Sequence, residues 1–149
     1  MQFNFNPTLQ NDWVQNKWFA ATPGMPALVK AVAAAGCTVI GLTGRNTAQQ
    51  DATIANLTQE GYVDAAGKPL FTAAHYYTKW LSTATPPAYI TCVDRAKCTT
   101  IEYKSGTRRY LENQKGLDIV ANLGDQFSDL KGGYADATFK LPNPTYYLP

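Results

Sequence analysis

The chain has 149 residues, of which 45% are hydrophobic and 16% are charged, and its net charge is +2. A chain of this length forms one domain that buries roughly two-thirds of its unfolded surface, and the composition is globular rather than disordered. The low charge, spread over scattered lysines and arginines, gives no argument for nucleic acid, and no apolar stretch approaches the roughly 20 residues of a membrane span, so we expect neither partner.

The first half of the chain is predicted to alternate helix, strand and helix. Pro26 suits the first turn of a helix, and Gly36 is a plausible end for it. A short β-rich run follows at residues 39–42 and ends in a polar turn, and residues 46–61 read as a second helix. Helix, strand and helix with tight joints indicate an α/β fold with a mainly parallel, Rossmann-like sheet flanked by helices.

Residues 62–98 interrupt this alternation with glycines and prolines. We interpret them as a small insertion over one end of the sheet, within a single domain that covers residues 1–149. Four closely spaced side chains in the insertion are typical of packing but also fit the lining of a binding pocket, and both interpretations stay open: His75, Tyr76, Tyr77 and Trp80.

The α/β pattern resumes in the second half of the chain. Residues 99–104 read as a short strand that ends at Lys104, followed by a helix capped by Ser105 and stopped by Gly116. Residues 117–123 are a continuous apolar run, as expected for a strand in a sheet buried on both faces. The tail, "ATFKLPNPTYYLP", predicts one more strand and a proline-rich aromatic closing segment.

Cys92 and Cys98 bracket a short polar loop. They suit a disulfide in an oxidising compartment, while two free thiols remain the alternative. A zinc site is not expected, because the spacing is unusual for zinc ligands and the chain has one histidine. The disulfide would agree with secretion, although the start of the chain lacks the basic and apolar regions of a signal peptide.

Polar side chains follow three predicted strands, and ligands of parallel α/β sheets bind beyond such strand ends. A hydroxyl with free backbone amides, a lysine and an acidic pair together suit a phosphate with a divalent cation. Each group alone also has an ordinary explanation as a turn, a solvated lysine or a helix cap. The candidate residues are Thr43, Gly44, Arg45, Lys104, Asp125 and Asp129.

Four segments, "VIGLTGR", "YKSGTRRYLE", "IVANLGDQFSDL" and "FKLPNPTYYLP", resemble the haloacid-dehalogenase-like acid phosphatases, a class that includes plant vegetative storage proteins and bacterial secreted acid phosphatases. The resemblance covers most of the chain. It implies a Rossmann-like sheet, an often secreted protein, and hydrolysis of small-molecule phosphate monoesters through an aspartyl-phosphate intermediate with Mg²⁺.

Matched motif by motif, the resemblance also implies roles for the candidate residues. Thr43 would bind the phosphoryl group, and Gly44 and Arg45 would shape its turn. Lys104 would neutralise the charge of the phosphate and of the nucleophile. The Mg²⁺ site would be formed by Asp125, with Asp129 supporting the ion directly or through water.

The family's nucleophile motif, a D-x-D at the end of a central first strand, does not occur in the 149 residues, and Asp12 is the only acidic residue before Thr43. We therefore expect a chain that starts after the first strand and turns over little substrate. Exposed sheet edges would then favour oligomerisation.

Three functions follow from these observations. The first is an acid phosphatase-type site without its nucleophile, and the alternative is a non-catalytic phosphate-binding or storage-like protein that retains the phosphate and Mg²⁺ pocket. The third, an unrelated α/β hydrolase, has little support, because the sequence has no G-x-S-x-G.

Overall fold

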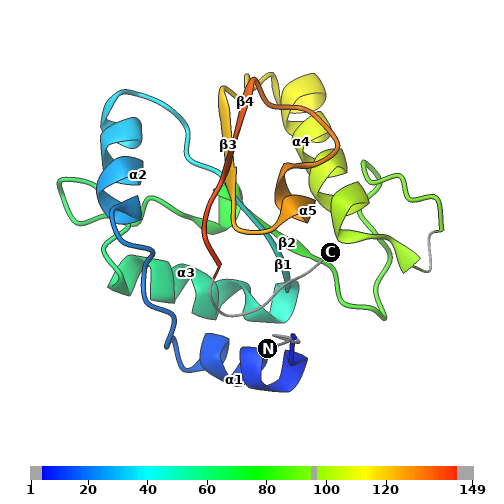
Figure 1. The fold of residues 1–149 in the computed structure, drawn as a ribbon, viewed down its shortest axis with the longest axis horizontal. Coiled ribbons are helices and arrows are strands. Elements are labelled where there is room, and N and C mark those ends of the chain that lie inside the picture. Colours follow the sequence, from blue (N-terminus) through cyan, green and yellow to red (C-terminus); the bar gives the residue numbers. More distant parts are fainter. Residues whose placement is uncertain (1–4, 95–96, 144–149) are drawn as a thin grey trace. The chain divides into compact units, whose positions relative to one another are not determined.

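The computed structural model describes residues 5–94 and 97–143, which form two compact units (Figure 1). We call Asn6–Leu81 the N-terminal unit, and the remaining described residues, from Ser82 onward with Phe5, the C-terminal unit. The predicted aromatic closing segment lies outside the described residues from residue 144 on. No helix in the described ranges is both long and apolar enough to cross a membrane.

The N-terminal unit opens with a helix that the sequence did not predict. Its N-cap is Asn6, whose side chain accepts hydrogen bonds from the backbone N–H groups of Thr8 and Leu9 at 3.0 and 3.1 Å. Pro7, at the first helical position, needs no hydrogen-bond partner for its nitrogen. The helices and strands of this unit are α1 (Pro7–Gln15), α2 (Met25–Ala34), β1 (Gly41–Asn46), η1 (Thr47–Gln49), α3 (Gln50–Gln59), η2 (Ala73–His75) and β2 (Tyr76–Lys79).

The predicted helices of this unit are confirmed. Pro26 lies in the first turn of α2, and Asn46 caps η1, which leads into α3. The strand between them is shifted, because β1 begins at Gly41 and continues through the predicted polar turn to Asn46. The cause is its pairing partner, because β1 pairs in parallel with β2 from Gly41 to Thr43 and again at Asn46.

Residues 62–98, which we interpreted as an insertion, contain strand β2. Within this stretch Tyr76–Lys79 belongs to the sheet, where it pairs with β1 from Gly41 onward. Tyr76 packs so closely on Gly41 that a Cβ there would lie 3.1 Å from Cγ of the tyrosine and closer still to its ring edge. The absence of a side chain at Gly41 therefore lets the two strands pair, and Tyr76 is a packing residue.

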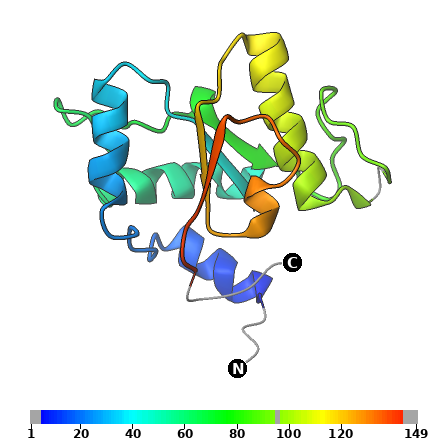
Figure 2. The ribbon, with the colours of Figure 1, turned by 45° about the horizontal axis from the view of Figure 1, so that its top comes forward.

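The C-terminal unit contains α4 (Thr100–Lys115), β3 (Ala121–Gly124), α5 (Phe127–Leu130) and β4 (Ala137–Lys140). Strands β3 and β4 are parallel and in register, so that Ala121 faces Ala137 and Gly124 faces Lys140. The short helix α5 contacts α4 on one side and both strands on the other; in Figure 2, α5 is orange and α4 is yellow.

The prediction of a strand at residues 99–104 is wrong, because this segment starts α4. The Thr99 side chain accepts a hydrogen bond from the Glu102 backbone N–H, and the Glu102 carboxylate accepts one from the Thr99 N–H. This reciprocal capping box outweighs the β-propensity of the threonines and isoleucine. The predicted stop at Gly116 is confirmed, with a left-handed φ of 67°.

The strand predicted at residues 117–123 is shorter and less buried than expected. It starts at Ala121, and both Val120 and Leu123 are exposed, at 55% and 37%. The described strands form two separate parallel pairs, β1–β2 and β3–β4. Parallel strands flanked by helices nevertheless confirm the α/β class.

Candidate functional site

A buried ion pair joins two of the predicted site residues in the C-terminal unit. The Lys104 ammonium on α4 donates to Oδ1 of Asp129 on α5, and the two side chains are 9% and 11% exposed. Lys104 reaches this position from the second turn of α4, two residues after Glu102, which closes the capping box. The start of the helix therefore sets where the lysine charge lies.

Asp129 is fixed at every polar atom that the structure describes. Its Oδ2 accepts from the backbone N–H of Gln126 at 3.0 Å, and its carbonyl accepts from Arg108 Nη1 at 2.8 Å and from Asn122 Nδ2 at 2.9 Å. Its carboxylate also lies directly on Gly124, where a Cβ would come within 2.8 Å of Oδ2. Asp129 is thus suited to hold Lys104 rather than to move.

Arg108 anchors the chain that follows Asp129. Its guanidinium donates to three carbonyl oxygens, those of Asp129, Lys131 and Gly133, at 2.8, 2.6 and 2.8 Å. Burial lowers the pKa of Arg108, while the negative charges of Asp129 and Glu112 act in the opposite direction. Because Lys104 and Arg108 are four residues apart, one face of α4 places both cations against the α5 turn.

Asp125, the residue that immediately follows β3, is less buried than Asp129. Its Oδ2 accepts a hydrogen bond from Asn143 Nδ2 and a second one from Gln126 Nε2 at 3.3 Å. No described residue donates a hydrogen bond to Oδ1 of Asp125. This carboxylate therefore has an oxygen available for a ligand.

A buried hydroxyl lies in the same turn. Ser128 is 2% exposed, and its Oγ has no hydrogen-bond partner among the described residues. Buried hydroxyls rarely stay unpaired, because desolvation without a partner is costly. The turn that carries Asp125 and Asp129 thus also contains a polar atom that a bound ligand or water would satisfy.

Thr43, Gly44 and Arg45 lie in the N-terminal unit, at an irregular stretch of β1 where the pairing with β2 shifts register. The Arg45 backbone N–H donates to Thr43 Oγ1 at 3.3 Å. The Arg45 guanidinium donates to Thr53 on α3 at 3.0 Å and lies 4.7 Å from the centre of the Phe19 ring. Arg45 therefore stabilises the shape of this stretch, and bulges of this kind recur beside active sites.

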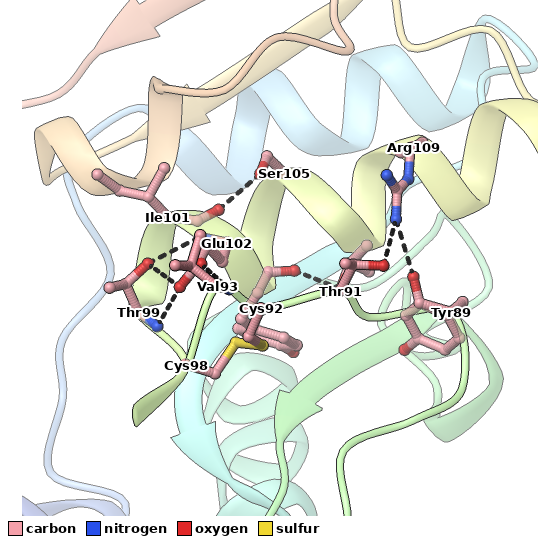
Figure 3. The surroundings of a disulfide bond; sticks show 12 residues. Tyr89, Thr91, Cys92, Val93, Cys98, Thr99, Ile101, Glu102, Ser105 and Arg109 are labelled. Atoms are coloured by element: carbon pink, nitrogen blue, oxygen red, sulfur yellow. Dashed lines mark hydrogen bonds between the residues drawn. A yellow bond between two sulfur atoms is a disulfide. The ribbon is translucent and has the colours of Figure 1, made fainter. Parts of the chain in front are cut away.

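Cys92 and Cys98 form a disulfide with their Cα atoms 5.1 Å apart, immediately before α4 (Figure 3). Glu102 joins the disulfide-closed loop to the helix, because its carboxylate accepts from the Val93 N–H at 2.7 Å as well as from Thr99. Arg109 also contacts the preceding segment, donating to the Tyr89 carbonyl at 3.2 Å. The loop is thereby attached to the helix that carries Lys104.

The structure thus brings together Lys104 and Asp129, and Asp125 lies in the same turn as Asp129. The other three candidates, Thr43, Gly44 and Arg45, belong to the N-terminal unit. Sequence reasoning missed three side chains of the C-terminal unit, those of Arg108, Asn122 and Asn143. The T-x-x-E capping signature at Thr99 would have placed Lys104 and Arg108 on one helix face. Asn122 and Asn143 gave no such signal, because their contacts depend on how the chain folds.

Comparisons with known proteins agree with these motifs. The model of the HAD superfamily, subfamily IIIB (acid phosphatase), matches residues 2–149. The chain is 36% identical over 149 residues to the stem 28 kDa glycoprotein of Glycine max, covering 97% of this chain and 50% of that protein. It is 33% identical to acid phosphatase 1 of Solanum lycopersicum, covering 91% of this chain and 46% of the relative.

The chain therefore spans about half the length of the curated relatives that it matches. Among solved structures, a class C acid phosphatase from Bacillus anthracis aligns with a TM-score of 0.65 at 23% identity, covering 97% of this chain and 57% of that one. That likeness concerns the fold. The match of the family model over almost the whole sequence shows that the chain belongs to the acid phosphatases of HAD subfamily IIIB.

Proposed function

We propose that this chain carries the phosphate-binding and Mg²⁺-binding part of an acid phosphatase site for small-molecule phosphate monoesters. The observation that carries the proposal is the buried Lys104–Asp129 pair beside the partly exposed carboxylate of Asp125. An ammonium and a carboxylate held next to each other suit an anion and a cation that bind together, as a phosphate and Mg²⁺ do.

The residues present fit a magnesium ion. Asp125 has one oxygen without a donor among the described residues, and Ser128 offers a buried hydroxyl without a partner there. Mg²⁺ binds through one or two carboxylates and keeps several waters, so this donor set is sufficient. Asp129 supports the site through Lys104, because both of its carboxylate oxygens already accept hydrogen bonds. Bound Mg²⁺ would supply charge stabilisation at a phosphoryl oxygen.

In this proposal each protein group has a defined task. Lys104, which Asp129 holds in place, offers its remaining N–H groups to phosphate oxygens. Thr43, Gly44 and Arg45 belong to the N-terminal unit, and their part in phosphate binding stays a prediction from the family resemblance. Hydrolysis through a covalent intermediate also needs a nucleophilic carboxylate, and no D-x-D occurs in the sequence. We therefore expect binding with little turnover.

Two measurements test this proposal. Calorimetric titration with Mg²⁺ and inorganic phosphate should show binding that Asp125→Asn removes, whereas Asp118→Asn, an exposed change of the same charge in the same unit, retains it. Hydrolysis of p-nitrophenyl phosphate with Mg²⁺ should be slow. Rapid hydrolysis that Asp125→Asn abolishes would mean that the chain contains a nucleophile we have missed.

A storage-like role is the second candidate, favoured by similarity to proteins named for vegetative storage. One of these, vegetative storage protein 1 of Arabidopsis thaliana, is 42% identical over 72 residues, covering 48% of this chain and 24% of that protein. Phosphate and Mg²⁺ binding without turnover would agree with this role, and the absence of both would exclude a retained pocket. The disulfide supports a secretory or other oxidising compartment. Oligomerisation through a sheet edge stays a prediction.

A further inference from the structure

The segment that follows β4 crosses the carboxyl end of β3. Parallel pairing aligns Gly124 with Lys140, and the next residue, Leu141, donates its backbone N–H to the Gly124 carbonyl at 2.8 Å. Pro142 then restricts Leu141 to an extended backbone. These constraints place Asn143 beside the residue after Gly124, which is Asp125.

Asn143 contacts Asp125 through its side chain. Its Nδ2 donates to Oδ2 of Asp125, and Gln126 Nε2 reaches the same oxygen at 3.3 Å. Both amide donors therefore converge on one carboxylate oxygen, while Oδ1 accepts from none of the described residues. A carboxylate held by one oxygen in this way has a fixed orientation, with the other oxygen directed to a different partner.

We propose that Asn143 is a positioning residue for the divalent cation. Its amide holds Oδ2 of Asp125 so that Oδ1 is presented to Mg²⁺, and the docking of residues 141–143 on β3 is thereby linked to cation binding. This inference rests on the proposed function, which assigns the cation to Asp125. It adds a residue outside the β3–α5 turn that has no contact with the cation itself.

The physical reason is preorganisation. Groups that hydrogen-bond a metal-ligating side chain fix its orientation, and removing them typically weakens metal binding 10- to 100-fold. Without Asn143, the Asp125 carboxylate would keep the longer Gln126 contact and could rotate. Each binding event would then have to immobilise the carboxylate, which lowers the affinity without removing a ligand.

The test is calorimetric titration of the whole chain with Mg²⁺. Asn143→Leu keeps the approximate size of the side chain but removes its donor, and the Kd should rise by about 10- to 100-fold. Asn113→Leu makes the same replacement at an exposed position of α4 and should leave the Kd unchanged. Adding Asn143→Leu to Asp125→Asn should cause no further loss, because the carboxylate that it positions is already gone.

The outcomes separate this inference from the proposed function. If the native chain binds Mg²⁺ and Asp125→Asn abolishes binding while Asn143→Leu binds as tightly as the native chain, the positioning role is refuted and the cation site stands. If the native chain binds no Mg²⁺, both are refuted.

A measurement on the native sequence covers the case in which Asn143→Leu does not fold. The side-chain amide resonances of Asn143 in a ¹⁵N-labelled chain should shift as Mg²⁺ saturates the site, and they should lose this response in Asp125→Asn. Asn143 resonances that do not respond to saturating Mg²⁺, while Asp125 binds it, would also refute the inference.

Discussion

The clearest prediction concerns Asp129→Asn, which breaks the buried pair with Lys104. Oδ1 of Asp129 accepts from the lysine ammonium and Oδ2 accepts from the Gln126 backbone N–H. An asparagine replaces one oxygen by an amino group, so in either orientation it points a donor at a donor. The Lys104 side chain is only 9% exposed, and the substitution leaves its ammonium without a negatively charged partner.

Removing one partner of a buried ion pair destabilises a protein by about 3–5 kcal/mol. With a urea m-value of about 2 kcal/mol per M, the unfolding midpoint of the C-terminal unit should fall by roughly 1.5–2.5 M. The matched control is Asp118→Asn, whose carboxylate is exposed and whose effect should stay within about 0.5 kcal/mol.

The assay has to report on the unit that contains the pair. Trp13, Trp18 and Trp80 all lie in the N-terminal unit, so tryptophan fluorescence does not follow α4. Hydrogen exchange of the α4 amides, measured by mass spectrometry in increasing urea, does. A shift for Asp129→Asn no larger than that of Asp118→Asn would refute the view that this pair is a buried, coupled unit.

Three further predictions follow from other contacts. Gly124→Ala should destabilise the C-terminal unit by about 1–3 kcal/mol in the same exchange assay, because the new Cβ would meet the Asp129 side chain; an unchanged stability would show that Asp129 can move aside. Cys92→Ser should cost roughly 2 kcal/mol and speed exchange in the first turn of α4, and a native-like exchange pattern would contradict this. Burial raises the pKa of Tyr76 from 10.0 to about 12, so the neutral phenol favours the folded state, and this stability is lost between pH 10 and 12. Tyr76→Phe should remove roughly 2–3 kcal/mol of that alkaline loss in the free energy of unfolding, measured by fluorescence in urea. An identical alkaline loss in both proteins would refute this prediction.

Local sequence determined much of the fold. The helices α2 and α3 were predictable from local features: Pro26 has no N–H that needs a partner in the first turn, and Asn46 accepts a hydrogen bond from the Ala48 backbone N–H. Gly116 ends α4 for a similarly local reason. The motif "GDQFSDL" predicted that two aspartates follow the end of a strand. Such features need no distant partner, so the sequence is sufficient to identify them.

Where local signals competed, the sequence was ambiguous. Residues 99–104 combine β-branched side chains with a capping box, and the capping box prevails because it satisfies two backbone N–H groups at once. Strand β1 extends to Asn46 because β2 offers a parallel partner there, and β2 lies in a segment that resembles an insertion. The length of a strand depends on the strand it pairs with, and the hydrophobic pattern of one segment does not show that partner.

The candidate site divides in the same way. The sequence by itself named Lys104, Asp125 and Asp129, because their chemistry and motif spacing are written in the chain. Only the tertiary structure showed that Asp129 is committed to Lys104 and that Asn143 holds Asp125. Those bonds join residues 25 and 18 positions apart, and hydrogen-bond partners at such separations are chosen by the packing of α4, β3 and β4 rather than by any local pattern.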